Sequence, residues 1–250
     1  MTLTVRQFPC LSDNYGFLVC DDASGQTACV DTPDARAILA ALDEAGWKLD
    51  FIFNTHWHPD HAGGNAAIKA ATGATIIGPA EVTRIAPLDR TVGDGDVVDL
   101  GETRFEVIAC GGHTLGHITY YDDADRIAFV GDTLFALGCG RLFEGTAEQM
   151  WGSLQRLAAL PDETTIYCAH EYTASNARFA LTVDGDPALK ARSEAVFAAR
   201  QRGEPTVPTS IGLEKATNPF LRAPAIAHLA GRPDHEAFAK IRAAKDSFRG

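Results

Sequence analysis

The sequence contains no apolar run of the roughly 18 to 20 residues that a membrane-spanning helix needs. The first seven residues also lack a basic stretch leading into an apolar segment. Basic residues are scarce as well, with 22 Lys plus Arg against 33 Asp plus Glu and a formal net charge of -11. General nucleic-acid binding relies on basic side chains that displace phosphate counterions. We therefore expect a cytosolic chain whose partners include neither a membrane nor a nucleic acid.

Cysteine is sparse, at six residues in 250, and no C-x-x-C pair occurs. This density is far below that of a disulfide-stabilised scaffold, so we expect reduced cysteines that are mostly buried. A hydrophobic content of 46% and a charged content of 22% are typical of a globular protein. A chain of this length is sufficient for one large domain, or for one domain with a small addition.

The first two-thirds of the chain alternates short β-branched or aromatic runs with turns rich in Gly and Asp. Strands are predicted at 3–8, 15–20, 27–31, 51–54, 75–77, 104–109, 118–121, 127–130 and 165–168, and helices at 34–45, 64–71 and 147–159. Strand-like runs stop after about Tyr172, and helices are predicted at 174–181, 187–202 and 234–248. The pattern indicates an α+β domain followed by a helical C-terminal part.

Residues 54–64 read NTHWHPDHAGG and follow the apolar strand at 51–53. Three imidazoles and one carboxylate within six residues form a dense set of metal ligands. His56 and His58 can point the same way from an extended backbone, because side chains two apart share a face. The next turn can bring Asp60 and His61 to a second point, so one loop can serve two metals.

Three further candidate ligands each follow a predicted strand: His113, Asp132 and His170. Ligands just beyond the carboxyl ends of strands converge where α/β sheets place their sites. The whole set of five His and two Asp is sufficient for two metal ions. By contrast, His117 introduces a strand and is expected to hold its loop by hydrogen bonding, whereas His228 and His235 are expected to be solvated.

Residues 55–64 resemble the Thr-His-x-His-x-Asp-His signature of the metallo-β-lactamase superfamily, and GHTLGH at 112–117, GDT at 131–133 and AHEY at 169–172 match its later ligand motifs in order. More specific motifs resemble glyoxalase II, the hydroxyacylglutathione hydrolase family. They are LSDNY at 11–15, GCGRLFEGT at 138–146, HEYT at 170–173 with Asn176, Phe179 and Ala180, Glu214 with NPFLR at 218–222, and RAAKDSF at 242–248.

The resemblance implies a four-layer αββα sandwich at 1–173 and a helical glutathione-binding domain at 174–250. It implies that His56, His58 and His113 hold one metal, that Asp60, His61 and His170 hold the other, and that Asp132 bridges them, with Asp60 and Asp132 as catalytic residues. The implied substrate-binding residues are Arg141, Phe143, Tyr172, Arg242 and Lys245. Many family members have a tyrosine where this chain has Phe143.

The implied reaction is hydrolysis of S-D-lactoylglutathione to D-lactate and glutathione, a step in methylglyoxal detoxification, by a monomer that uses two divalent ions. Zinc is the first candidate, and His and carboxylate ligands also accept iron or manganese. Two cations can supply a hydroxide and stabilise the oxyanion that forms. The alternatives are a glutathione persulfide dioxygenase with one iron, a non-catalytic metal-binding module, and a β-lactamase or lactonase. The motifs at 218–222 and 242–248 favour the hydrolase of glutathione thioesters.

Overall fold

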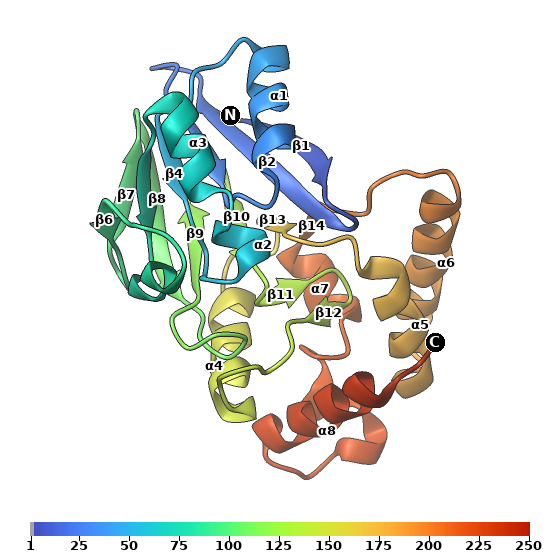
Figure 1. Ribbon diagram of the computed structural model, residues 1–250. Coiled ribbons are helices and arrows are strands. Elements are labelled where there is room, and N and C mark those ends of the chain that lie inside the picture. The colour runs from blue at the N-terminus through green and yellow to red at the C-terminus, as the bar shows by residue number, and fades with distance from the viewer. Residues whose placement is uncertain (1–2) are drawn as a thin grey trace. The chain divides into compact units, whose positions relative to one another are not determined.

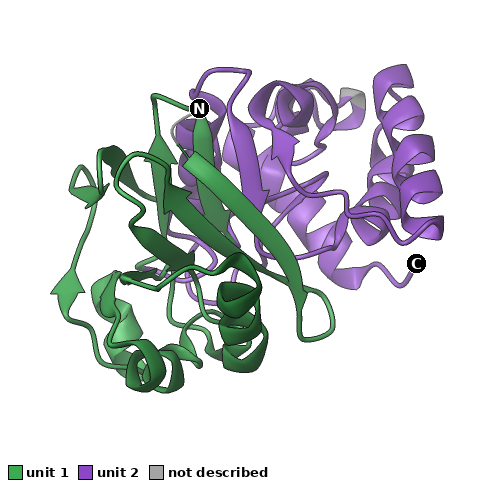
Figure 2. Cartoon of the chain, turned by 90° about the horizontal axis from the view of Figure 1, so that it is seen from above, with its two compact units in different colours: residues 1–109, 116–131 green, residues 110–115, 132–250 purple. Residues whose placement is uncertain are grey.

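The computed structural model describes residues 3–250 and contains two compact units. Unit 1 runs to residue 109 and includes residues 116–131, and unit 2 comprises residues 110–115 and 132–250 (Figure 2). No helix among residues 3–250 has both the length and the apolar character needed to cross a membrane. The six cysteine side chains are buried, as the sequence predicts.

The first sheet of unit 1 joins an antiparallel part to a parallel part. Its strands are, in order, β1 (Leu3–Cys10), β2 (Asn14–Asp21), β3 (Thr27–Val30), β4 (Phe51–Phe53), β5 (Thr75–Gly78) and β6 (Arg90–Thr91). Neighbouring parallel strands need a crossover connection, and here helices α1 (Ala35–Ala45) and α3 (Asn65–Thr72) provide it (Figure 1). Both helices contribute to one apolar core, through Ile38 and Ile68.

Helix α1 has clear start and stop signals. The Asp34 side chain accepts hydrogen bonds from the backbone N–H groups of Arg36 and Ala37, and Gly46 ends the helix in the left-handed conformation at φ 67°. The apolar residues Ile38 and Leu42 lie one turn apart and are both buried. Local sequence chemistry therefore fixes where α1 begins, which face it buries and where it ends.

The second set of strands in unit 1 is antiparallel and packs its aromatic side chains against the first sheet. These strands are β7 (Val97–Leu100), β8 (Thr103–Ala109), β9 (Ile118–Asp122) and β10 (Ile127–Gly131). The Phe53 ring lies 5.2 Å from that of Tyr120 and 5.9 Å from that of Phe105, measured between centroids. The buried Tyr120 hydroxyl donates a hydrogen bond to the Asn54 carbonyl at 3.0 Å. This core lies directly beneath the end of β4, which carries the histidine-rich loop.

Unit 2 is mainly helical. Its elements are the pair β11 (Leu134–Phe135) and β12 (Gly138–Cys139), α4 (Ala147–Ala158), β13 (Thr165–Cys168), α5 (Thr173–Val183), α6 (Pro187–Gln201), β14 (Thr209–Ser210), α7 (Ile211–Thr217) and α8 (Asp234–Ser247), with 3-10 turns η2 (Ala223–Ala225) and η3 (Ala227–Leu229). Leu137 packs with Ala177, Ala180, Leu189 and Val196 in one core cluster. The β11–β12 pair therefore lies against α5 and α6.

Every strand and helix predicted from the sequence is present, with ends displaced by no more than two residues. The expectation that no strand follows Tyr172 is wrong, because β14 pairs with β13. The sequence also gave no indication of β6, β7, β11, β12, α2 (Pro59–Ala62), the 3-10 turn η1 (Ala80–Arg84) or α7. Most of these span two to five residues, which is too short for a side-chain period to be recognised.

Candidate metal centre

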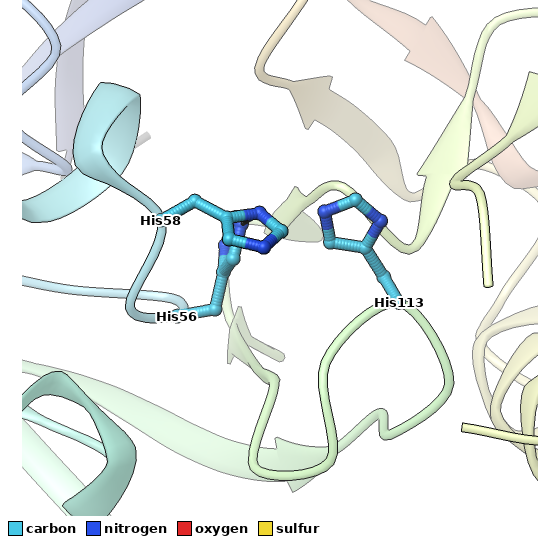
Figure 3. A group of neighbouring side chains, drawn as sticks. All are labelled: His56, His58 and His113. Atoms are coloured by element: carbon cyan, nitrogen blue, oxygen red, sulfur yellow. Dashed lines mark hydrogen bonds between the residues drawn. The ribbon is translucent and has the colours of Figure 1, made fainter. Parts of the chain in front are cut away.

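The loop after β4 brings His56 and His58 together. The Nε2 of His56 lies 3.0 Å from the Nδ1 of His58, and the two rings meet edge to face (Figure 3). The Thr55 hydroxyl lies 3.0 Å from the Nδ1 of His56, and both side chains are completely buried. Because one nitrogen of His56 contacts the hydroxyl, the other is directed at the space beside His58. These two rings can therefore offer nitrogen donors to a common ion.

Asp31, which lies outside the motifs of the sequence, orients the third histidine of this loop. The Nδ1 of His61 lies 2.8 Å from the Oδ2 of Asp31, and Asp31 also accepts hydrogen bonds from the backbone N–H and hydroxyl of Thr55. A carboxylate that holds one imidazole nitrogen leaves the other for a metal and raises its basicity. Asp31 has a φ of 58°, so it has left β3 and turns toward this loop. An acidic residue at the end of an apolar strand was the available signal.

Asp60 lies beside His61 on the short helix α2. One Asp60 carboxylate oxygen is 3.6 Å from the Nε2 of His61, and the same oxygen accepts a hydrogen bond from the Asn14 side chain at 3.2 Å. Asn14 is 5% exposed and belongs to the motif at 11–15. Asp60 and His61 therefore present an oxygen and a nitrogen side by side, and Asn14 fixes the direction of the carboxylate.

Unit 2 carries a second cluster, in which one carboxylate lies between two imidazoles. One oxygen of Asp132 is 3.3 Å from the Nε2 of His113, and its other oxygen is 3.4 Å from the Nε2 of His170. The Nδ1 of His113 lies 2.9 Å from the Arg141 carbonyl oxygen, so the proton of that ring faces the carbonyl and Nε2 faces Asp132. A carboxylate that presents one oxygen to each of two imidazoles can bridge two cations.

Gly140 is required by the close packing at Asp132. A Cβ at position 140 would lie 2.0 Å from the Asp132 carbonyl oxygen and 3.0 Å from the Nδ1 of His113. No side chain fits there without moving backbone atoms. Gly140, one of three glycines in the motif at 138–146, is therefore explained by the contact between its backbone and the backbone of Asp132.

A cavity of about 420 Å³ in unit 2 adjoins this cluster. Its lining includes His113 and Asp132. All five residues that the resemblance implies for substrate binding also line it, namely Arg141, Phe143, Tyr172, Arg242 and Lys245. Four further residues without a predicted role in binding complete the lining, namely Phe135, Cys139, Ser175 and Asn176. Aromatic side chains lie at the end near the histidines. The Tyr172 ring stacks on His170 at 4.6 Å, and the Phe143 ring meets His113 edge-on at 5.2 Å.

The cationic wall of the cavity comes from α8 and the segment after β12. The Lys245 ammonium donates hydrogen bonds to the carbonyl and the hydroxyl of Ser175, both at 3.1 Å. Burial lowers the pKa of Lys245 from its usual 10.5 to about 8, with nearby arginines adding to the effect. Arg242 is only 4% exposed and donates to the Cys139 carbonyl at 2.8 Å and to Asp246 at 2.9 Å. Arg141 is the exposed cation of the three.

The remaining histidines differ in burial. His117 is completely buried, and its ring stacks on that of His56 at 4.7 Å. Its expected role in holding its loop stays a prediction. His228 is exposed, and His235 is half-buried on α8. The prediction of a solvated histidine is therefore correct for His228.

Both units thus carry His and Asp side chains of the kind that hold metal ions. A profile described as the metallo-beta-lactamase superfamily matches residues 27–170, and the chain belongs to that superfamily. A second profile, hydroxyacylglutathione hydrolase C-terminus, matches residues 171–248. Within the superfamily the chain is a member of the hydroxyacylglutathione hydrolase, or glyoxalase II, family.

Curated relatives agree over nearly the whole chain. The hydroxyacylglutathione hydrolase of Maricaulis maris is 58% identical over 98% of this chain and 99% of its own length. That of Erythrobacter litoralis is 56% identical over 98% of this chain and 100% of its own length. Among solved structures, ETHE1 from Myxococcus xanthus superposes with a TM-score of 0.69 at 29% identity, covering 96% of this chain and 90% of its own. The BLEG-1 B3 metallo-beta-lactamase superposes with a TM-score of 0.67 at 20% identity, covering 87% of this chain and 99% of its own. The predicted fold, with its helical C-terminal part, is confirmed.

Proposed function

We propose that this chain hydrolyses S-D-lactoylglutathione and related 2-hydroxyacyl glutathione thioesters to the hydroxy acid and glutathione. The chain is similar over nearly its full length to proteins named hydroxyacylglutathione hydrolase, and this similarity supports the reaction class. The observation that carries the proposal is the cavity of unit 2, in which three cationic side chains and the carboxylate of Asp132 line the same space. A substrate with negative carboxylates at one end and a scissile thioester at the other suits that distribution of charge.

We propose further that His56, His58 and His113 bind one divalent cation, that Asp60, His61 and His170 bind a second, and that Asp132 bridges them. The donors suit zinc, iron and manganese, and zinc is our first choice. The fixed Nδ1 atoms of His61 and His113 support this assignment, because each leaves Nε2 as the donor. Cations held by these residues would supply Lewis acidity, which would lower the pKa of a water and polarise the thioester carbonyl.

The chain's own residues bind and orient the substrate. Arg141, Arg242 and Lys245 attract the carboxylates of glutathione. A local group of cations is needed for this, because the chain as a whole has a net charge of -11 and repels anions. Tyr172 and Phe143 provide apolar surface beside His170 and His113. The leaving thiolate needs little assistance from an acid, because a thiol has a pKa of about 8.5 in the cysteine reference. Asp60 and Asp132 are the proposed catalytic carboxylates.

We propose the same division of the chain as the sequence implies, with a catalytic domain at 1–173 and a glutathione-binding domain at 174–250, in a cytosolic monomer. The two family profiles meet between residues 170 and 171, which supports a boundary in this region. The substrate-binding residues fall on both sides of it, because Arg141 and Phe143 precede the boundary and Lys245 follows it.

One assay tests the function. The purified chain is incubated with S-D-lactoylglutathione before and after dialysis against a chelator, and its metal content is measured by elemental analysis. We expect hydrolysis that is lost on chelation and restored by zinc, iron or manganese, with two ions per chain. Oxygen uptake with glutathione persulfide, together with no thioester hydrolysis, would instead indicate the dioxygenase alternative.

A further inference from the structure

The β11–β12 hairpin, residues 134–139, adjoins the candidate metal cluster of unit 2 at both of its ends. Asp132 precedes it, and Gly140 follows it. The Gly140 N–H donates to the Thr133 carbonyl at 3.2 Å, so the two ends of the hairpin meet beside the Asp132 backbone. Two hairpin residues, Phe135 and Cys139, also line the cavity. Movement of this hairpin would therefore move both a cavity wall and the backbone that carries Asp132.

The turn of the hairpin has a conformation that its sequence does not favour. Leu137 has a φ of 57°, in the left-handed region that residues other than Gly, Asn and Asp seldom adopt. Its side chain is completely buried among residues of α5 and α6. A residue in such a conformation persists only where its surroundings hold it. The hairpin consequently depends on contacts from outside itself.

Two side chains of the α7 region supply such contacts. The Glu214 carboxylate accepts the Leu137 N–H at 2.9 Å. The Asn218 amide donates to the carbonyl of Phe135 at 3.1 Å and to the carbonyl of Gly138 at 2.9 Å. Glu214 and Asn218 also bond to each other at 2.9 Å. Together they hold three backbone groups of a six-residue hairpin that lies about 80 positions earlier in the chain.

The orientation of these two side chains is fixed from behind. The other oxygen of Glu214 accepts the Thr209 hydroxyl at 2.6 Å and pairs with the Arg192 guanidinium. The Phe220 N–H donates to the Asn218 amide oxygen at 2.9 Å, which directs the amide nitrogen at the hairpin. Glu214 and Asn218 are both completely buried. A buried carboxylate with every partner in place has one stable arrangement.

We propose that Glu214 and Asn218 are positioning residues that act through the β11–β12 hairpin to hold Asp132 and the adjoining cavity wall in place. The consequence for turnover rests on the proposed function. The motif at 218–222 has no assigned role in binding metal or substrate. Support of the hairpin by Asn218 gives a physical reason for the first residue of this motif. Asn176 and Arg242 complete the support, because they donate to the hairpin carbonyls of Ala136 and Cys139.

The test compares Glu214→Gln and Asn218→Ser with a matched control. Asp184→Asn removes a carboxylate in the same unit that pairs with Arg222 at 3.0 Å and bonds to the Asp186 N–H, and neither of these partners belongs to the hairpin. Three readouts are taken on the metal-loaded proteins: amide hydrogen exchange over residues 132–140, metal retained in competition with a chelator, and kcat and KM for S-D-lactoylglutathione. Thermal unfolding places the variants and the control on one stability scale.

We expect faster exchange at the hairpin, metal retention weaker by about 10-fold, as is usual when support of a ligand is lost, and a fall in kcat that exceeds the rise in KM. The proposal would be overturned if Glu214→Gln and Asn218→Ser showed the same hairpin exchange and the same metal retention as Asp184→Asn at a similar loss of Tm. If Glu214→Gln does not fold, Asn218→Ser decides by the same measures. Failure of both to fold, with Asp184→Asn folded, would assign the two residues to stability alone and also overturn it.

The first two readouts need no turnover. Absence of thioester hydrolysis in the unaltered protein would therefore refute the proposed function while exchange and metal retention still measured the role of the hairpin.

Discussion

The carboxylate of Asp31 lies 2.8 Å from the Nδ1 of His61, across 30 positions of sequence. The contact directs the Nε2 of His61 toward the neighbouring Asp60 carboxylate, 3.6 Å away. It also connects the end of β3 with the loop after β4, since Thr55 donates twice to the same carboxylate. One acidic side chain thus organises a large part of the donor set in unit 1.

Asp31→Asn should weaken metal binding by about 10- to 100-fold, because an amide no longer supports the basicity of His61. Competition of the metal-loaded protein with a chromogenic chelator measures this loss. Asp43→Asn, at an exposed position on α1, removes the same charge from unit 1 and serves as the control. Equal metal affinity in the two variants would show that Asp31 does not support His61.

Asn14→Asp should also lower metal content, because a second carboxylate would face Asp60 at the present 3.2 Å contact. The variant has nearly the same size as the original, so repulsion is the main change. We expect fewer ions per chain by elemental analysis after dialysis. Gln26→Glu adds the same charge in an exposed turn of unit 1 and should keep its metal. Full metal content in Asn14→Asp would show that Asn14 does not orient the Asp60 carboxylate for metal binding.

Gly140→Ala should disrupt the cluster in unit 2, because its Cβ would lie 2.0 Å from the Asp132 carbonyl oxygen. We expect a loss of stability of about 1 to 3 kcal/mol from overpacking, with loss of bound metal. Gly152→Ala is the control, since a Cβ there meets nothing within 4 Å in the interior of α4. It should stabilise the protein by roughly 0.5 to 1 kcal/mol. Thermal unfolding and elemental analysis distinguish the two variants, and a Gly140→Ala protein as stable as wild type would contradict the packing argument.

Binding of the substrate carboxylates should weaken as the pH rises through about 8, because the pKa of Lys245 is lowered to about 8. Burial is the main cause, Arg242, Arg178 and Arg141 add to the decrease, and Asp246 opposes it. The protonated form carries the attraction, so it is complete below this pH and is lost above it. KM for S-D-lactoylglutathione, measured between pH 6.5 and 9.5, should increase at the alkaline end.

Two substitutions at the same position check this assignment. Lys245→Ala should raise KM more than it lowers kcat and abolish the alkaline increase, because a remote contact persists equally in ground and transition states. Lys245→Arg should keep KM flat to a higher pH, since a guanidinium stays charged. An unchanged alkaline rise in KM in both variants would assign the titration to another group.

The secondary structure followed closely from local patterns. Strand β4 and helix α1 were predicted to within one residue, because a short apolar run, helical apolar spacing and the Asp34 cap are properties of adjacent residues. Helix α7 was missed although Ser210 caps it. Its seven residues hold a glycine and no long apolar period, and its position is stabilised by Glu214 in contacts with distant parts of the chain.

The sequence alone determined which residue types form the candidate centre and where strands end beside them, since both depend on neighbours in the chain. The tertiary structure decided which partners orient those residues. His61 is held by Asp31, the β11–β12 hairpin by Glu214 and Asn218, and the Cys139 carbonyl by Arg242, across separations of 30 to 103 positions. Such contacts follow from how buried polar groups satisfy one another once the core has packed, and no local period in the sequence encodes them.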